Sequence, residues 1–260
     1  MLTAENLTIT LGQRPVLQGV SFAAASGHVT AIVGPNGSGK TTLLRALTGD
    51  VKGAGRIVLN DMDIARTRAP QLAAVRAVLS QSNALAFPFT VIEVVRLGLT
   101  AGLSAATPEV AHQALARVGL SGFATRPFAN LSGGEQSRVH LARVLAQVWT
   151  PVGPTGPCWL FLDEPVASLD IGHQVMVMNI ARSFADAGGG VVAVMHDLNL
   201  TAMYADKVTL LGGGAVVGCG APVAVLTDEL LSRAYRCTVR VNTPPLRGPY
   251  VLPQAAVDVL

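Results

Sequence analysis

Charged residues are scarce in this chain. Asp, Glu, Lys and Arg together make up 13% of the 260 residues, against a usual share of roughly 25%. A surface with so little charge suits an apolar or membrane-embedded partner, but a composition rich in Ala, Val and Gly has the same effect without any functional meaning. The net charge of +3 is small and scattered, so we expect no nucleic-acid partner.

Long apolar runs, a leader segment and patterned cysteines are also missing. No stretch reaches the ~18 uninterrupted apolar residues that a membrane-spanning helix needs. The first ten residues, MLTAENLTIT, lack the basic and apolar regions of a signal peptide. Cys158, Cys219 and Cys237 show neither metal-ligand spacing nor an even disulfide set. We therefore expect a soluble, cytosolic protein.

What the sequence does contain is an alternation of strand and helix patterns. Residues 28–34, 158–162 and 191–195 read as short β-branched or apolar strands, residues 55–64 as a further strand beside the first, and 207–218 as a hairpin. Helices are predicted at 41–49 and 170–187, and after a cap at Thr227. Further helix starts are predicted at Thr90, which forms a capping box with Glu93, and at Thr107, an N-cap followed by Pro108. We expect one α/β domain over 1–238 with a helical insertion at about 85–150, closed by a Pro/Gly loop at 150–157, and a loosely attached tail over 239–260.

The segment GPNGSGKT, residues 34–41, follows the first of these strands and opens the helix at 41–49. Glycines at this spacing let successive backbone N–H groups surround phosphate oxygens at a helix N-terminus. Lys40 is one of only three lysines, against sixteen arginines, and a compact ammonium suits a phosphate group. Thr41 supplies a hydroxyl for Mg²⁺. The alternative reading is an ordinary glycine-rich turn; we predict a nucleotide site.

Other polar residues stand at strand ends. Asp163 and Glu164 end the apolar run LFLDEP; adjacent strand residues point in different directions, so one can orient Mg²⁺ while the other acts as general base toward water. An exposed turn is the alternative. Gln81 follows VRAVLS and His196 follows VVAVM, where each could equally be a solvated or structural residue. In an open α/β sheet, ligands bind at this carboxyl edge.

The segment LSGGE, residues 131–135, is a second Gly-rich helix start. Ser132 and Glu135 have the spacing of a capping box. An ordinary capping box explains these two residues but not Gly133 and Gly134 between them. The arrangement again offers N–H groups and a helix dipole to an anion.

Together, GPNGSGKT, Gln81, LSGGE, LFLDEP, SLD (168–170) and His196 resemble the nucleotide-binding subunit of ATP-binding cassette (ABC) transporters, over about residues 2–235. The resemblance implies a P-loop NTPase fold of the ABC type: a RecA-like core with an antiparallel β subdomain, plus a helical signature subdomain. It implies that ATP and Mg²⁺ bind and that two copies pack head to tail, each LSGGE motif reaching the nucleotide of the other copy.

The same resemblance assigns residue roles. The catalytic residues would be Glu164, His196 and Gln81, and the Mg²⁺ ligands would be Thr41, Gln81 and Asp163. The nucleotide-binding residues would be Gly34, Pro35, Asn36, Gly37, Ser38, Gly39, Lys40, Thr41 and Thr42, with Ser132, Gly133, Gly134 and Asp170 acting across the dimer interface.

Finer features narrow the resemblance to importers. QSNALAFPFTVIEVVRLGL (81–99), DEPVASLDIGHQ (163–174) and GGGVVAVMHDLNLTAMYAD (188–206) are similar to ATPases of haem, iron-chelate and cobalamin importers, haem import above all. This implies a separate membrane permease, an indirect role for a periplasmic binding protein, and a peripheral position on the cytoplasmic side of the inner membrane. A ferric siderophore or cobalamin importer, and a non-transport ABC ATPase, are the alternatives.

One position departs from the family pattern. The family often stacks adenine on an aromatic residue just ahead of a glycine in the first hairpin. Here Leu11 precedes Gly12, and the next aromatic residue is Phe22. The sequence therefore leaves the base without an evident stacking partner.

Overall fold

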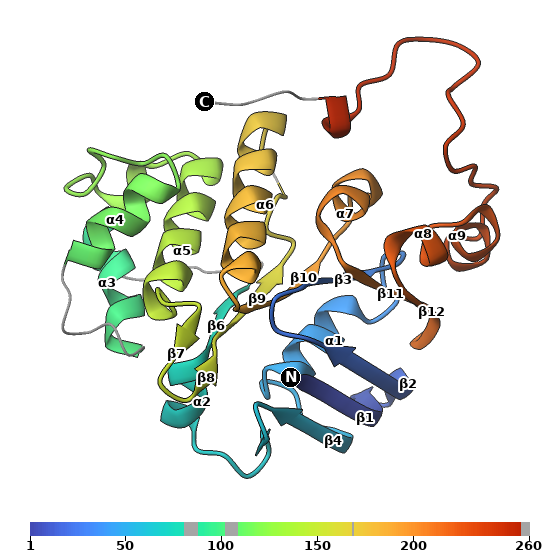
Figure 1. Cartoon of the computed structure of the whole chain (residues 1–260), viewed down its shortest axis with the longest axis horizontal. Helices are drawn as coiled ribbons and strands as arrows, with labels where there is room; N and C mark the ends of the chain where they lie inside the picture. Colours follow the sequence, from blue (N-terminus) through green and yellow to red (C-terminus); the bar gives the residue numbers. More distant parts are fainter. Residues whose placement is uncertain (81–87, 102–108, 168, 256–260) are drawn as a thin grey trace.

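A six-stranded sheet forms the centre of the protein. The computed structural model describes residues 1–80, 88–101, 109–167 and 169–255, shown in Figure 1. The strand order is β12-β11-β3-β10-β9-β6. The bounds are Val29–Val33 (β3), Arg76–Leu79 (β6), Trp159–Asp163 (β9), Gly190–Val194 (β10), Lys207–Gly212 (β11) and Ala215–Gly220 (β12). β11, β3, β10, β9 and β6 run parallel, and β12 pairs antiparallel with β11.

The central strands are buried on both faces, as parallel strands usually are. Along β9, Leu160 and Leu162 pack into one apolar cluster, while Trp159 and Phe161 pack into another on the opposite face. This is the two-residue alternation of a strand. The predicted strands at 28–34, 158–162 and 191–195, and the hairpin at 207–218, are confirmed within a residue or two.

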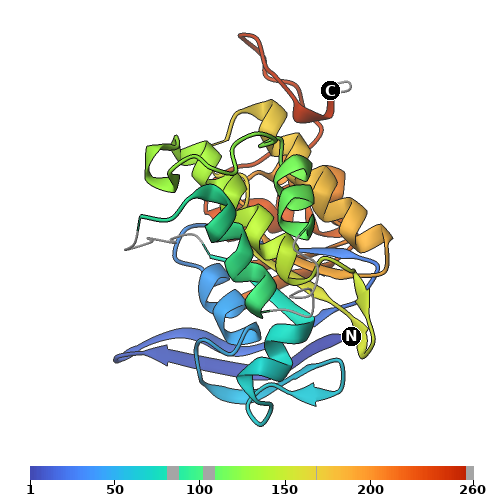
Figure 2. The same cartoon turned by 90° about the vertical axis from the view of Figure 1, so that its left-hand side faces the viewer.

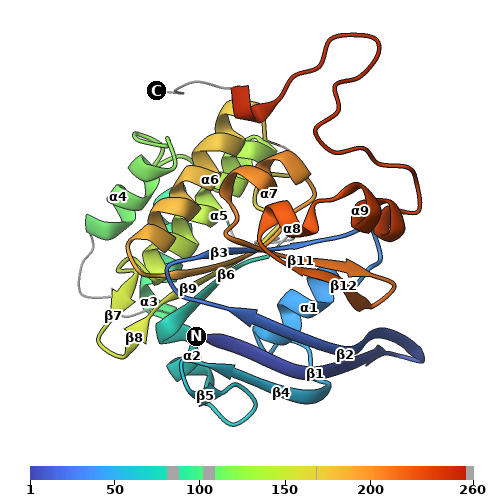
Figure 3. The ribbon, with the colours of Figure 1, turned by 45° about the vertical axis from the view of Figure 1, so that its right-hand side comes forward.

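Helices and a second sheet cover the two faces of the central sheet. On one face lie α6 (Ile171–Asp186) and α7 (Leu198–Tyr204). On the other lies α1 (Lys40–Leu47), packed between the central sheet and a four-stranded antiparallel sheet, as Figure 3 shows. The antiparallel sheet has the order β2-β1-β4-β5, with bounds Arg14–Ala24, Leu2–Leu11, Ala54–Leu59 and Met62–Asp63.

The predicted strand at 55–64 was wrong in its place and its continuity. β4 pairs with β1 rather than with β3, and a turn separates it from β5. Asn60 and Asp61 adopt positive φ angles of 46° and 63°, a conformation that Asn and Asp tolerate better than most residues. The chain therefore folds back at this point and cannot continue as one strand.

The insertion is helical, with α3 (Val91–Ala101), α4 (Glu109–Arg117) and α5 (Gly133–Gln147) packed together to one side of the central sheet (Figures 1 and 2). Gly98 of α3 lies against α5 so closely that a Cβ built there would be 2.0 Å from the Arg143 carbonyl oxygen. The capping pair Thr90–Glu93 forms as predicted, with N···Oε2 at 2.8 Å. The other predicted cap, Thr107-Pro108, lies outside the described residues. The domain boundaries at 85–150 and 238 stay predictions.

Short elements complete the fold. The predicted loop at 150–157 contains a small hairpin, β7 (Val152–Gly153) with β8 (Gly156–Pro157). α2 (Ala69–Val75), η1 (Phe128–Asn130) and α8 (Pro222–Val225) were not predicted. Thr227 caps α9 (Asp228–Tyr235) as predicted, and the tail has one described 3-10 turn, η2 (Pro253–Ala255). Among the described helices, none is both long and apolar enough to cross a lipid bilayer.

Candidate nucleotide site

The loop between β3 and α1 needs its glycines. Gly34, Gly37 and Gly39 have φ angles of +147°, +77° and +100°, a region that favours residues without a Cβ. A Cβ built on Gly34 would lie 2.2 Å from the Leu211 carbonyl oxygen, and one on Gly39 would lie 2.6 Å from Leu17 Cδ2. The loop is therefore wound tightly against the hairpin β11–β12 and strand β2.

The N-terminus of α1 is open to an anion. Its N-cap, Gly39, has no capping side chain, and its first turn carries no acidic residue. Lys40 is buried, and its Nζ donates to the carbonyl oxygens of Gly34 at 2.9 Å and Pro35 at 3.1 Å. Burial lowers the pKa of Lys40, against the opposing effect of Glu164 and Asp163. Negative phosphate oxygens at this place would favour the charged ammonium.

Asp163 ends β9 beside this loop. Thr41 Oγ1 donates to Asp163 Oδ1 at 3.2 Å, so the helix and the strand meet at these two side chains. Asp163 is only 5% exposed, and burial raises the pKa of its carboxyl. A nearby cation would stabilise the ionised carboxylate here.

The backbone turns sharply at Glu164, the residue after Asp163. Its φ is 52°, an uncommon conformation for a non-glycine residue that is typical of functional positions. Its N–H donates to the Val194 carbonyl at 3.2 Å, which fastens the turn to β10. Glu164 Oε1 lies 2.6 Å from Nε2 of His196, the second residue after β10. The parallel pairing of Val194 with Asp163 sets these strand ends side by side.

These side chains share one cavity of about 750 Å³. Lys40, Thr41, Glu164 and His196 all line it, so the structure brings together residues from the ends of three neighbouring strands. The full lining is Leu11, Arg14, Pro15, Val16, Asn36, Gly37, Gly39, Lys40, Thr41, Thr42, Glu164, His196, Gly213 and Gly214. Sequence reasoning flagged Leu11 but missed Arg14, Pro15, Val16, Gly213 and Gly214, because no local pattern places a distant hairpin against the loop.

The donor set around Thr41 fits Mg²⁺. The Thr41 hydroxyl and the Asp163 carboxylate are hard oxygen ligands, which Mg²⁺ prefers, and Mg²⁺ commonly takes its remaining ligands from water and substrate phosphates. No group of three or more His, Cys, Asp or Glu side chains in the described part of the chain could form a protein-only metal site. Gln81, the third predicted ligand, lies outside the described residues. Ser38 is 2% exposed, and its Oγ has no described hydrogen-bond partner.

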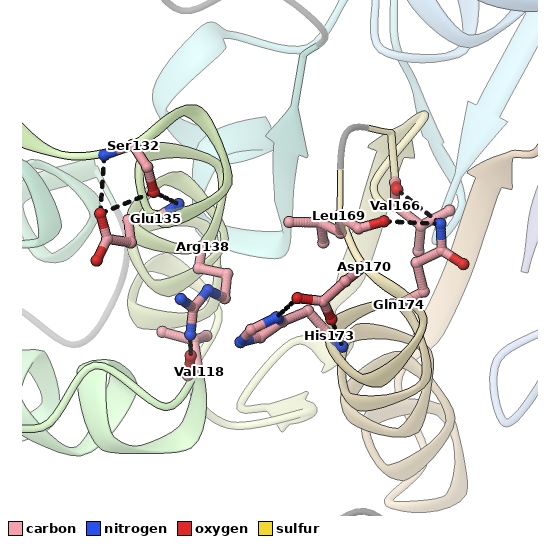
Figure 4. Close-up of polar contacts among 9 residues, drawn as sticks. All are labelled: Val118, Ser132, Glu135, Arg138, Val166, Leu169, Asp170, His173 and Gln174. Atoms are coloured by element: carbon pink, nitrogen blue, oxygen red, sulfur yellow. Dashed lines mark hydrogen bonds and ion pairs between the residues drawn. The ribbon is translucent and has the colours of Figure 1, made fainter. Parts of the chain in front are cut away.

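The second Gly-rich helix start is a true capping box. Ser132 Oγ accepts from Glu135 N at 3.3 Å, and Glu135 Oε2 accepts from Ser132 N and Ser132 Oγ, both at 2.8 Å (Figure 4). Hydrogen bonds from Ser132 lower the pKa of Glu135. Ser132, Gly133 and Gly134 are not among the residues that line the 750 Å³ cavity. Gly133 lines a separate hollow of about 260 Å³ between α5 and the end of β9.

Asp170 lies across from this helix start, at the N-terminus of α6. It caps α6 by accepting from His173 N at 2.9 Å, and its Oδ2 lies 2.8 Å from His173 Nδ1. These bonds lower the pKa of Asp170. In Figure 4 the buried Arg138 of α5 extends between the two elements, with Nη1 donating to the Val118 carbonyl at 3.2 Å. The sequence analysis did not predict His173 or Arg138. Only His173 had a local signal, because it stands three residues after the capping Asp170.

The sequence profile of a family described as ABC transporter matches residues 17–167. The chain therefore belongs to the ABC transporter family, whose cassettes bind and hydrolyse ATP, and the predicted fold class is confirmed. Over 257 residues it is 60% identical to the hemin import ATP-binding protein HmuV of Jannaschia sp. (strain CCS1), covering 98% of this chain and 95% of the relative. The corresponding protein of Roseobacter denitrificans is 58% identical over 98% of both chains.

Solved structures agree with this assignment. The ATP-binding cassette MJ1267 superposes with a TM-score of 0.77 at 26% identity, covering 90% of this chain and 98% of that one. A chain from a putative metal-chelate type ABC transporter in an inward-facing conformation superposes with a TM-score of 0.74 at 26% identity, covering 91% and 89%.

Proposed function

We propose that this chain is the ATP-hydrolysing subunit of an importer for hemin, driving uptake through a separate membrane permease. The observation that carries the proposal is similarity along nearly the whole chain, at 60% and 58% identity, to two proteins named as hemin import ATP-binding subunits. In such a complex the chain binds peripherally at the cytoplasmic side of the inner membrane. A periplasmic binding protein delivers the cargo without touching this subunit.

At the nucleotide, we assign phosphate binding to the loop Gly34–Thr42 and to the Lys40 ammonium. Thr41 and Asp163, with Gln81, would hold Mg²⁺, which supplies charge neutralisation of the β- and γ-phosphates. Glu164 accepts a proton from the attacking water, and it is held for that role by the 2.6 Å contact with His196. His196 also lines the cavity, where its imidazole can hydrogen-bond the terminal phosphate.

The positions of Ser132, Gly133, Gly134 and Asp170 support a dimer. These residues stand outside the lining of the nucleotide cavity, although a capped helix start with two glycines is suited to an anion. In a head-to-tail pair each copy would offer them to the nucleotide held by the other. ATP then stabilises the closed pair, and hydrolysis releases it, because the ligand binds the closed state preferentially.

A second candidate cargo is another iron chelate or cobalamin. The structural similarity to a putative metal-chelate type transporter favours this class, and the cassette itself does not contact the cargo in our proposal. A non-transport role has no comparable support.

Uptake by reconstituted liposomes tests the proposal. The chain is assembled with the permease from its own source, and hemin, a ferric siderophore and cobalamin are each delivered by the matching binding protein. We expect hemin uptake that needs ATP and is lost with Glu164→Gln. Uptake of a different chelate would overturn the cargo assignment alone. ATP hydrolysis without uptake of any of the three would overturn the transport function.

A further inference from the structure

The nucleotide cavity extends well beyond the phosphate loop. At one end it is lined by Lys40, Thr41 and Glu164, and at the other by Leu11, Arg14, Pro15 and Val16 of the β1–β2 hairpin, with Gly213 and Gly214 of the β11–β12 turn. Since the phosphates occupy the loop end, the nucleoside must lie toward the hairpin end. None of the described residues that line this cavity is Phe, Tyr or Trp.

The hairpin end is held firmly in place against the phosphate loop. A Cβ built on Gly39 would lie 3.2 Å from the Val16 carbonyl oxygen, and one on Gly214 would lie 2.5 Å from the same atom. Gln18 N donates to the Gly214 carbonyl at 3.0 Å. Val16 is therefore enclosed between the loop and the β11–β12 turn, which fixes where the neighbouring side chains of β2 stand.

Four hairpin residues line this end of the cavity: Leu11, Arg14, Pro15 and Val16. Val16 has no partner in the β1–β2 ladder, because the register shifts between the pairs Ile9–Leu17 and Thr10–Pro15. Leu11 pairs with Arg14 across the β1–β2 ladder, and directly opposed residues share a face. Leu11 is 48% exposed, so its side chain is accessible from the cavity that it lines. This end of the cavity thus carries the apolar side chains of Leu11, Pro15 and Val16 and one guanidinium.

The Arg14 guanidinium is available to a ligand. It is exposed, and no described residue forms a hydrogen bond or ion pair with it. A guanidinium is planar and weakly hydrated, and it stacks on aromatic ring systems. A lysine ammonium has the same charge but no such plane.

We propose that Arg14 provides the flat surface on which the base of ATP stacks, with Leu11 and Val16 completing an apolar edge, in place of an aromatic ring. The inference rests on nucleotide binding at the Gly34–Thr41 loop. Because a stacked guanidinium reads the face of a base and not its edge, adenine and guanine nucleotides bind with similar affinity.

Nucleotide binding to the full-length chain tests the proposal, with Glu164→Gln in every protein to prevent turnover. ATP, GTP and inorganic tripolyphosphate are titrated into chains carrying Arg14→Ala, Arg14→Lys or, as the matched control on the same turn, Gln13→Ala. We expect Arg14→Ala to weaken ATP and GTP about fivefold, in the range of an exposed cation–π contact, and to leave tripolyphosphate unchanged. Arg14→Lys should weaken ATP and GTP binding nearly as much as Arg14→Ala does. Gln13→Ala should bind all three ligands like the parent.

A gain-of-function variant adds a second readout. Leu11→Tyr in the Arg14→Ala chain places a ring at the same end of the cavity, and we expect it to restore ATP affinity. Full recovery with Arg14→Lys, or an equal loss of tripolyphosphate affinity in Arg14→Ala, would show that Arg14 acts through charge and would overturn the proposal. Unchanged ATP affinity in Arg14→Ala would also overturn the proposal. The same holds if Leu11→Tyr fails to restore the ATP affinity of the Arg14→Ala chain, or if the parent prefers ATP over GTP by more than about thirtyfold. These results leave the proposed ATPase function intact, whereas a parent chain that binds no ATP would overturn that function itself.

Discussion

His196 Nε2 lies 2.6 Å from Glu164 Oε1, joining the residue that follows β9 to the turn that follows β10. Both side chains line the cavity that contains Lys40. Glu164 is held at its backbone as well, since its N–H donates to the Val194 carbonyl oxygen. The contact with His196 therefore fixes the Glu164 carboxylate at the cavity that Lys40 also lines.

Glu164→Gln should retain ATP binding and lose turnover. The amide has nearly the same shape and can still contact His196, but it cannot accept a proton from water, so the rate should fall by about 10² to 10⁴. Phosphate release and equilibrium ATP binding measure the two effects, with Glu109→Gln on the exposed side of α4 as control. A variant that hydrolyses ATP at the parent rate would remove Glu164 as general base.

His196→Ala should lower kcat by about 10² while changing the KM for ATP little, because in the proposed mechanism the imidazole orients Glu164 and contacts the phosphate chiefly as charge develops. The double variant with Glu164→Gln should be no slower than Glu164→Gln alone, since residues that act as a unit are not additive. His112→Ala, on an exposed helix face, is the control. Strictly additive losses would mean that the 2.6 Å contact has no part in catalysis.

The phosphate loop and the central strands could be predicted because their signals are local. Glycines at 34, 37 and 39 have positive φ, and apolar runs of five residues become strands buried on both faces. The capping boxes at Thr90 and Ser132 likewise involve residues three apart. In each case the neighbouring residues alone determine the conformation.

The rest depended on contacts between distant segments. The strand at 54–59 ends in an apolar run, Ile-Val-Leu, like that of a central strand, but it pairs with β1. Arg14 and Gly214 lie at the nucleotide cavity because Gln18 bonds to the β11–β12 turn, which no pattern within either segment reveals. Contacts of this kind determine the hairpin end of the cavity.

Asp163→Asn should stabilise the nucleotide-free chain at neutral pH. Burial raises the pKa of Asp163, so the folded state holds that proton more tightly than the unfolded state does. The resulting stabilisation is complete below the unfolded pKa of about 3.9 and is lost as pH rises through the higher folded pKa. Near pH 7 the parent therefore buries an ionised carboxylate that the variant lacks.

Urea unfolding at several pH values measures this effect. The free energy of unfolding of Asp163→Asn should exceed that of the parent near neutral pH, and the difference should shrink as pH is lowered toward about 4. Asp61→Asn, in an exposed turn, is the control and should show no such trend. ATP hydrolysis should be lost in Asp163→Asn. A variant that is less stable than the parent at neutral pH would contradict the burial argument.

Mixed dimers test whether each nucleotide site is shared between two copies. A chain with Lys40→Ala lacks the ammonium group proposed to bind the phosphates. A chain with Ser132→Arg places a bulky cation at the helix start that would face the other copy in the proposed dimer. Each should be inactive alone, while Ser132→Arg should still bind ATP at its own Lys40. In a mixed pair both defects fall on one site and leave the other intact. Random pairing gives half mixed dimers, so the mixture should recover about a quarter of the parent rate.

Phosphate release from equal mixtures, after the chains have exchanged partners, provides the measurement. Ser121→Arg, on an exposed loop beyond α4, is the matched control and should be fully active. If each nucleotide site were formed by a single chain, the mixture would stay as inactive as its components, because every chain would carry one defect in its own site. Recovery would assign Ser132 and its two glycines to the partner's nucleotide, which is the role that their position outside the Lys40 cavity leads us to expect.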